Sequence, residues 1–289
     1  MTVSQHLKSA ASLVVISLNL AFFITLALPT SVVRLVVPPL APVAHRALDA
    51  IYRAAVAVDD FWLRRVMGIR WTSPSLDLDP KRPCVVLSNH VSWADIFLIQ
   101  SLLVSHGLVV KFLTKRELLA LPIVGLVLWA FDFPLLRRSS RRGEDDEARS
   151  RLDFEALRDA CRSARANPVA LVSFAEGTRA TASRRATRGS PYHHLLPPRV
   201  GGFAALCDGL GDAMSGVVDC TLVYPSEAAE ATFWRFLSGG LRELEIHAER
   251  IAPAEIPTAR DDRARWLEAR WASKDERIAR SLREGGRRP

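Results

Sequence analysis

Residues Ala11–Leu28 constrain the fold most, because this apolar run contains no charged side chain. At about 1.5 Å of rise per residue, a helix of this length just reaches across the ~30 Å hydrocarbon core of a bilayer, and Pro29–Val37 would extend it. A secretory signal peptide is the alternative, since Lys8 precedes the run. No clear small-x-small cleavage site follows, and Pro29 interrupts the expected position. The run therefore predicts an N-terminal membrane anchor over residues 1–40.

Basic residues are concentrated after the apolar run. Only Lys8 precedes it, whereas these arginines follow: Arg34, Arg46, Arg53, Arg64, Arg65 and Arg70. The positive-inside tendency therefore predicts a single N-terminal span with the bulk of the chain in the cytoplasm.

Residues 41–82 form an expected second segment, a helix followed by a linker. Val43–Met67 mixes apolar side chains with arginines, which is typical of an amphipathic helix lying in the membrane interface. An ordinary helix packed on the following domain has the same pattern, and both interpretations stay open.

From Pro83 the pattern alternates between β-rich runs and helical stretches, which predicts an α/β domain over residues 83–289, with a mostly parallel sheet and flanking helices. The expected strands are Cys84–Ser88, Val109–Thr114, Val169–Phe174 and Val217–Val223, and the expected helices are Trp93–Leu103, Lys115–Trp129, Glu144–Ala166 and Gly202–Leu210. Arg137–Ser150 is expected to be a charged loop leading into a helix. The tail, Asp261–Leu282, has helical apolar spacing and predicts a helix that docks on the domain or on the membrane.

The first candidate site follows the strand Cys84–Ser88. His90 comes directly after the strand, and Asp95 follows in the same turn. A histidine at a strand end can remove a proton from an alcohol, and a carboxylate can fix its tautomer. No activated serine or cysteine accompanies the pair, which suggests direct attack by a substrate hydroxyl. The alternative is that Ser92–Asp95 is only a capping box at a helix start.

A second candidate site follows the strand Val169–Phe174. Gly177 allows a tight turn after it, and the guanidinium of Arg179 offers a fork of donors suited to a phosphate. Glu176 could accept hydrogen bonds from a glycerol hydroxyl or hold the arginine.

Together the two segments, read as NHxSWxD and FxEGTR blocks, resemble the PlsC-like glycerolipid acyltransferase family, and the resemblance covers residues 80 to 285. Phe133–Arg138 is similar to the family's second motif. Tyr192–Gly202 resembles the YihG-type bacterial and lysocardiolipin acyltransferase branches.

The resemblance implies an O-acyltransferase that moves a fatty acyl group from acyl-CoA or acyl-carrier protein to 1-acylglycerol-3-phosphate. His90 would be the general base and Asp95 would orient it. The acceptor site would comprise Glu176, Gly177, Thr178, Arg179, Arg137 and Arg138. No cofactor or metal is expected, and a bacterial-type inner membrane is the implied location, with an anionic membrane surface as a further partner.

Two departures from the family pattern concern the ends of this site. Ala175 replaces the proline usual in the third motif, which should loosen the turn slightly without removing a chemical group. Thr221–Pro225 is the nearest equivalent of the fourth motif, so the donor end of the site is less defined than the acceptor end.

The net charge of the chain bears on other classes of function. The 39 Lys and Arg against 31 Asp and Glu give a net charge of +8, which fits an anionic membrane or nucleic acid. The arginines are scattered, with no recognition helix or aromatic-rich basic strand, which argues against nucleic acid.

The adjacent His193 and His194 have no carboxylate or cysteine at ligand spacing, and the four cysteines are expected to be reduced core residues. Lysocardiolipin or lysophosphatidylglycerol as acceptor, and a catalytically silent membrane scaffold, are the alternatives.

Overall fold

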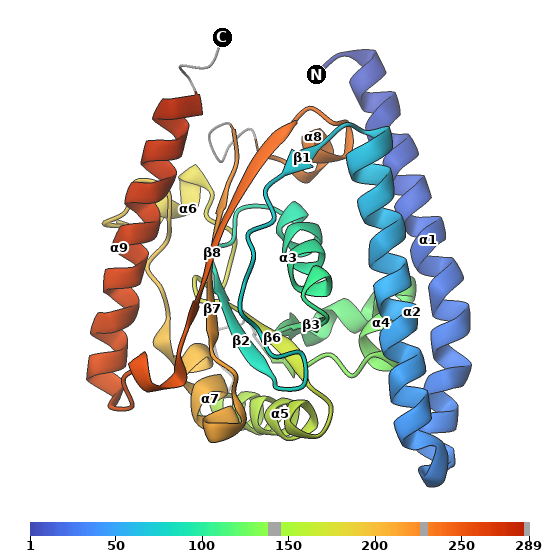
Figure 1. The fold of residues 1–289 in the computed structure, drawn as a ribbon. Helices are drawn as coiled ribbons and strands as arrows, with labels where there is room; N and C mark the ends of the chain where they lie inside the picture. The colour runs from blue at the N-terminus through green and yellow to red at the C-terminus, as the bar shows by residue number, and fades with distance from the viewer. Residues whose placement is uncertain (138–145, 226–230, 286–289) are drawn as a thin grey trace.

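The computed structural model describes residues 1–137, 146–225 and 231–285, and Figure 1 shows a helical hairpin beside an α/β body. The hairpin consists of α1 (Val3–Val36) and α2 (Ala41–Phe61), which continues as one π-helical stretch, Trp62–Val66. Pro38 and its neighbour Pro39 lack backbone N–H groups, which helps to end α1, and they form the short 3₁₀ turn Pro38–Leu40 between the helices.

Helix α1 is the one helix within the described ranges that is long and apolar enough to cross a membrane. One face of it nevertheless carries buried polar side chains that bind the body. Near its start, the hydroxyl of Ser12 donates to the carbonyl of Leu237 at 2.8 Å. Near its end, the hydroxyl of Ser31 donates to the carbonyl of Ala130 at 2.8 Å, and Arg34 forms an ion pair with Asp132. The body therefore holds α1 at both ends.

Helix α2 lies between α1 and α3 (Ala94–Ser105). Its buried face consists of Ala44, Leu48, Tyr52 and Val56, and the Tyr52 hydroxyl donates to the carbonyl of Val110 at 2.9 Å. The interpretation of this segment as a helix packed on the domain therefore describes its inner face, while contact of its outer face with lipid stays a prediction.

The body is built on a six-stranded sheet in the order β1-β8-β7-β2-β6-β3. All neighbouring pairs are parallel except β7 and β8. The strands are β1 (Arg70–Trp71), β2 (Cys84–Ser88), β3 (Val109–Phe112), β6 (Val169–Phe174), β7 (Val217–Val223) and β8 (Glu243–Ile251), and β4 (Thr114–Lys115) pairs with β5 (Leu135–Leu136) in a separate ladder. The predicted α/β class with a mostly parallel sheet is confirmed.

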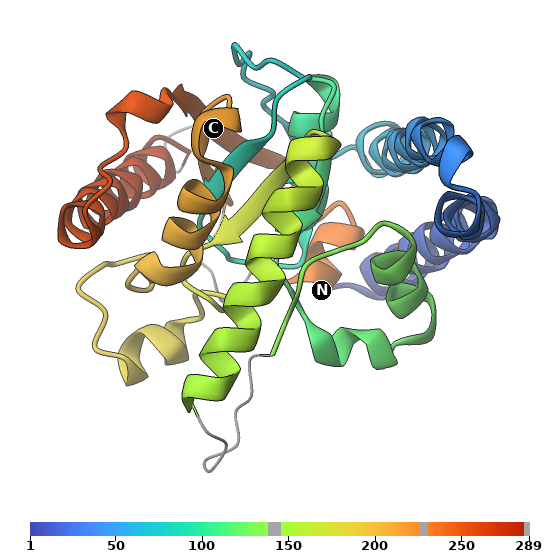
Figure 2. The same ribbon diagram turned by 90° about the horizontal axis from the view of Figure 1, so that it is seen from below.

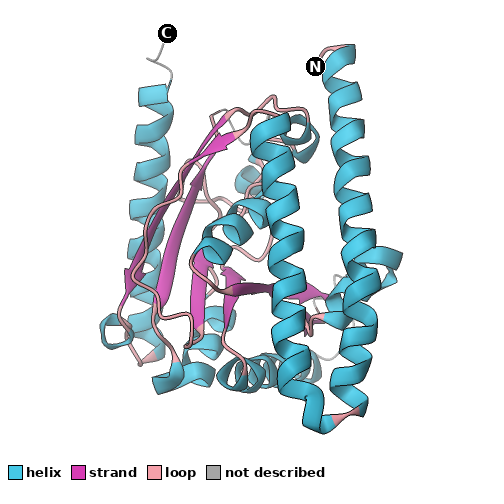
Figure 3. Ribbon diagram, turned by 45° about the vertical axis from the view of Figure 1, so that its right-hand side comes forward, coloured by secondary structure: helices cyan, strands magenta, loops and turns pink. Residues whose placement is uncertain are grey.

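Helices cover both faces of this sheet, as Figures 2 and 3 show. Helices α5, α7 and α9 pack on one face, and α3 with the hairpin packs on the other. The remaining helical bounds are α4 (Pro122–Ala130), α5 (Asp146–Ala166), α6 (Ala182–Thr187), α7 (Val200–Leu210), α8 (Phe233–Leu237) and α9 (Arg260–Gly285), with 3₁₀ turns at Arg116–Ala120, Gly211–Ala213 and Pro253–Glu255. Burial on both faces explains why β2, β6 and β7 are almost continuously apolar.

The structure tests the expectations for the tail helix and for the cysteines. The tail helix α9 docks on the domain, against β7 and α7. The four cysteines are free and buried. Most of the predicted loop Arg137–Ser150 lies outside the described residues, and α5 begins at Asp146.

Candidate active site

The candidate site lies where β2, β6 and β7 end side by side, at the edge of the sheet where α/β proteins place their ligands. Asn89 continues the pairing of β2 with β7 through its side chain. Its amide nitrogen donates to the Leu222 carbonyl at 3.0 Å, and its amide oxygen accepts from the Leu222 N–H at 2.8 Å. This fully buried clamp fixes the backbone from which His90 projects.

His90 and Asp95 form a hydrogen-bonded pair. The Nδ1 atom of His90 lies 2.7 Å from Oδ2 of Asp95, which also accepts the N–H groups of Val91 at 2.7 Å and Ser92 at 3.0 Å. Asp95 therefore ties the start of α3 to His90 and can orient its ring, while the catalytic role of the pair stays a prediction. When Nδ1–H of His90 donates its hydrogen bond to Asp95, Nε2 is unprotonated and can act as a base. The His90 side chain is 18% exposed.

Tyr224 is a third member of this cluster that the sequence did not single out. Its hydroxyl donates to Oδ1 of Asp95, the oxygen that does not face His90. Burial and the charge of Asp95 raise the pKa of Tyr224 well above its usual value, so the group stays a donor. Tyr224 lies directly after β7, far from His90 in sequence, and only its place in the segment Thr221–Pro225 could have drawn notice to it.

Glu176 is fully buried beneath the pair. One carboxylate oxygen accepts the backbone N–H of His90 and the other accepts that of Leu196, both at 3.2 Å. Burial raises the pKa of Glu176 to about 8, and the negative charge of Asp95 adds to this effect. Both oxygens are thus engaged by the backbone, so in this structure Glu176 positions the loop of His90. Its predicted contact with an acceptor stays a prediction.

The turn after Glu176 brings the second motif beside the first. Gly177 has φ +70°, a conformation that glycine adopts without strain, and the N–H of Ala180 donates to the carbonyl of His90 at 2.7 Å. The guanidinium of Arg179 lies 5.8 Å from the ring centre of Trp93, next to the start of α3. Thr178 and Arg179 are partly exposed, as substrate-binding residues must be.

The two other predicted arginines follow β5 in the sequence. Arg137 is exposed after β5, and its backbone N–H donates to Asp153 at 2.6 Å. Arg138 lies outside the described residues. Their predicted phosphate contacts stay predictions.

An apolar cavity of about 310 Å³ lies between the hairpin and the body. It is lined by residues of α1, α2, α3 and α4, including Phe23, Val56, Phe97 and Leu128. Aromatic rings connect it to the pair. His90 stacks on Phe174 with ring centres 4.1 Å apart, and Phe174 stacks on Phe112, which lines the cavity. Two stacked aromatic rings therefore connect His90 to a space suited to a hydrocarbon chain.

Comparison with known proteins assigns this arrangement to a family. A family model described as Acyltransferase matches residues 72–224, more than half of the chain. The chain therefore belongs to the acyltransferase family, as the two motifs predicted, and the class of enzyme is that of an O-acyltransferase.

Relatives and a solved structure agree with this assignment. The 1-acyl-sn-glycerol-3-phosphate acyltransferase 3 of Arabidopsis thaliana is 26% identical over 94% of this chain and 75% of its own length. Lysocardiolipin acyltransferase 1 of Danio rerio is 28% identical over 75% of the chain, and the human 1-acyl-sn-glycerol-3-phosphate acyltransferase delta is 30% identical over 73%. The chain spans only 57% and 58% of the length of these two relatives.

The fold is similar to the crystal structure of the 1-acyl-sn-glycerophosphate acyltransferase PlsC from Thermotoga maritima. The TM-score is 0.58 at 18% identity, and the match covers 98% of this chain and 96% of the other. The match includes the hairpin, so the helices before residue 72 are part of the shared fold.

Proposed function

We propose that this protein transfers a fatty acyl group from a thioester to the free hydroxyl of 1-acylglycerol-3-phosphate, giving phosphatidic acid. The observation that carries the proposal is the His90–Asp95 pair, held 2.7 Å apart and connected by the rings of Phe174 and Phe112 to an apolar cavity. The names of the relatives, which act on this acceptor or on lysocardiolipin, support the same chemistry.

In the proposed reaction, Nε2 of His90 takes the proton of the acceptor hydroxyl as its oxygen attacks the thioester carbonyl. Asp95 stabilises the resulting imidazolium. The tetrahedral oxyanion collapses, the carbon–sulfur bond breaks, and the thiolate of the donor takes the proton from His90. The acyl group reaches the acceptor in one transfer, without a covalent enzyme intermediate and without a cofactor or metal.

Different parts of the site would bind the acceptor and the acyl chain of the donor. Thr178 and Arg179, which are partly exposed beside the pair, together with Gly177, would bind the phosphate and glycerol of the acceptor. Arg137 and Arg138 would add phosphate contacts. The apolar cavity would hold an acyl chain, and the carrier of that chain is acyl-CoA or acyl-carrier protein.

A second candidate acceptor is favoured by the comparisons. Lysocardiolipin acyltransferases are among the relatives at 26% to 28% identity. Remodelling of lysocardiolipin or lysophosphatidylglycerol would use the same base and the same thioester, so only the acceptor assay separates it from the primary proposal.

The location we propose is the cytoplasmic face of a bacterial-type inner membrane, with α1 lying along one leaflet. Ser12 and Arg34 both bind the body, and at about 1.5 Å per residue they are roughly 33 Å apart along α1. A helix that crossed the ~30 Å hydrocarbon core would carry these contacts, and the body with them, into the lipid. The outer face of α1 is instead apolar along its length, including Leu7, Leu18 and Phe22. This arrangement is proposed as an alternative to the single span expected from the sequence, which stays a prediction.

The test uses membranes that contain the wild-type protein or His90→Ala, with labelled acyl-CoA and three lysolipids: 1-acylglycerol-3-phosphate, lysophosphatidylglycerol and monolysocardiolipin. His90-dependent label in phosphatidic acid supports the primary proposal, and label in another product changes the acceptor. No His90-dependent transfer, with acyl-carrier protein also tried as donor, would leave a silent membrane scaffold as the better account.

A further inference from the structure

Asp95 is held from two sides, and the two sides come from distant parts of the chain. Oδ2 accepts His90 and two backbone N–H groups from its own turn. Oδ1 accepts the hydroxyl of Tyr224, and within the described part of the chain no second donor reaches it. Because Asp95 is fully buried, this hydroxyl is what satisfies that oxygen.

The sheet fixes Tyr224 at this place. In the parallel pairing of β2 with β7, Ser88 lies opposite Cys220, and the Asn89 side chain then binds both backbone polar groups of Leu222. Tyr224 follows two residues later. The clamp that positions His90 on β2 therefore also sets the position of Tyr224 on β7.

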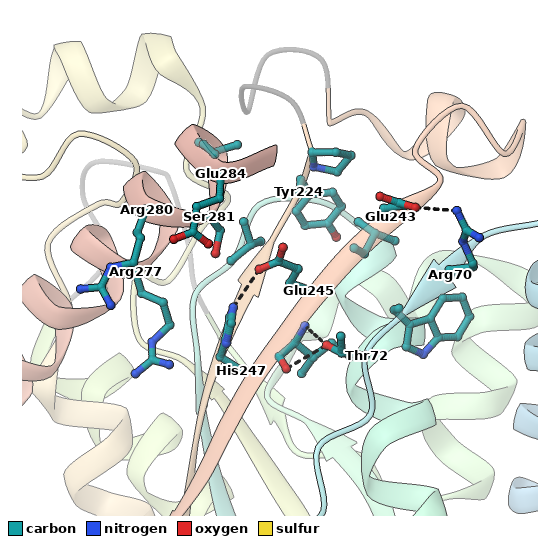
Figure 4. Close-up of a pocket in the computed structure, with 16 residues that line it drawn as sticks. Arg70, Thr72, Tyr224, Glu243, Glu245, His247, Arg277, Arg280, Ser281 and Glu284 are labelled. Carbon is teal, nitrogen blue, oxygen red and sulfur yellow. Dashed lines mark hydrogen bonds and ion pairs between the residues drawn. The ribbon is translucent and has the colours of Figure 1, made fainter. Parts of the chain in front are cut away.

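The ring and the hydroxyl of Tyr224 contact different parts of the molecule. The ring borders an open groove of about 680 Å³ between β8 and α9, and Figure 4 shows Tyr224 across that groove from Arg277 and Arg280. Tyr224 is only 4% exposed, with its hydroxyl on Asp95. Removal of the hydroxyl alone keeps the ring as a wall of the groove and changes only the contact with Asp95.

From this geometry we infer that Tyr224 is a positioning residue of the reaction, which acts on His90 through Asp95. The inference rests on the proposed function for its kinetic part. The hydroxyl keeps Asp95 turned so that Oδ2 faces Nδ1 of His90, and it shares the negative charge of the carboxylate. Without it, Oδ2 is still held by the N–H groups of Val91 and Ser92, but Oδ1 loses the Tyr224 hydroxyl and more of the carboxylate charge acts on His90.

The test compares Tyr224→Phe with wild type in the acyl-transfer assay. A hydrogen bond to a charged group has an energy equivalent to about a 10- to 100-fold rate change, so kcat is expected to fall by about that factor with KM for the lysolipid unchanged. Because Asp95 then stabilises the imidazolium more strongly, the acidic limb of the kcat/KM profile is expected to move to higher pH, by about 0.5 to 1 unit.

Two control variants separate this effect from general damage. Tyr192→Phe removes a hydroxyl that lies 3.4 Å from the Glu268 carbonyl, on an exposed part of the same domain. Arg277→Gln changes the same groove without touching Asp95. Both are expected to keep the wild-type kcat and the wild-type pH profile.

A titration of His90, which does not require acyl transfer, tests the inference about Tyr224 separately from the proposed function. The ¹⁵N resonances of the His90 ring, assigned with His90→Ala, are followed against pH in detergent-solubilised wild type and Tyr224→Phe. A higher titration midpoint in the variant supports the inference even if no acceptor is found. An unchanged midpoint in a folded variant, or an unchanged kcat and pH profile in an active one, overturns it whatever the acceptor.

Discussion

At the scale of single residues, Glu176 is the second fully buried carboxylate of the site, beside Asp95. It is fully buried, and its two oxygens hold the backbone of His90 and of Leu196. Leu196 follows His193 and His194, whose backbone N–H groups donate to Asp275 of α9 at 2.9 and 2.7 Å. Glu176 therefore links the loop of the base to a segment that is itself fixed by the tail helix.

The titration of Glu176 should appear in the stability of the protein. Burial raises its pKa in the folded state to about 8, above the usual value of 4.5, so between these limits the folded protein holds a proton that the unfolded chain has released. Stability from this group is present below about pH 4.5 and is lost as the pH rises through about 8. Thermal unfolding in detergent should therefore show a midpoint that falls between pH 5 and 9.

The control for this prediction is Glu176→Gln, which keeps the size of the side chain and removes its charge. The variant should lose the part of the pH dependence that belongs to Glu176. Asp59, whose pKa burial raises to about 7, contributes in the same direction but is present in both proteins and cancels in the difference. Equal pH slopes in both proteins would contradict the assignment.

Which site residues could be predicted from the sequence depended on their distance along the chain. His90 and Asp95 lie in one turn, and Glu176 and Arg179 lie in another, so each pair was visible as a local pattern. The contacts of Tyr224 with Asp95, and of Leu196 with Glu176, join segments that only the parallel sheet brings together. No spacing rule predicts such contacts.

At the scale of elements, the buried strands were the most predictable part of the fold. The predicted bounds of β2, β6 and β7 are the observed ones, because strands covered on both faces are continuous apolar runs. Strand β8 was missed although Leu244 and Ile246 alternate with outward-facing polar residues, which is the period-two pattern of a strand with one exposed face. The short helices α6 and α8 have too few residues for a periodic pattern.

The hairpin also forms one wall of the apolar cavity, so the proposed binding of the acyl chain there can be tested on α2. Ala55 lines the cavity from α2, and its carbonyl accepts the side-chain amide of Asn19 at 3.0 Å. Ala55→Phe would fill part of the ~310 Å³ while keeping that backbone contact. If the cavity holds the acyl chain, the variant should prefer shorter donors, seen as a larger fall in kcat/KM for long chains than for short ones.

Val58→Phe provides the matched control, because Val58 lies one turn further along α2 and is 43% exposed. It adds a ring to the same helix outside the cavity and should leave the chain-length profile as in wild type. If Ala55→Phe lowered kcat/KM equally for all chain lengths, the acyl chain would have to bind elsewhere.

At the scale of the whole molecule, the helical hairpin and the α/β body pack together as one unit. The exposed apolar residues of α1 continue onto α4, which packs against it and exposes Ile123, Leu126 and Trp129. A surface of this kind fits a membrane leaflet better than water. The apolar cavity is lined by residues of the same two elements, α1 and α4.

Labelling of cysteines distinguishes a helix that lies in one leaflet from one that crosses the bilayer. Ser4→Cys places a thiol before the apolar run, and Arg46→Cys places one beyond the turn of the hairpin; both positions are exposed, and the four native cysteines are buried. In inverted membrane vesicles with the cytoplasmic face outward, a membrane-impermeant maleimide should label both variants. A spanning helix would hide Ser4→Cys inside the vesicle, and detergent would then be needed to label it. Equal labelling before and after detergent would place both ends of α1 on the side of the body, which is the outcome we expect from its contacts with Leu237 and Asp132.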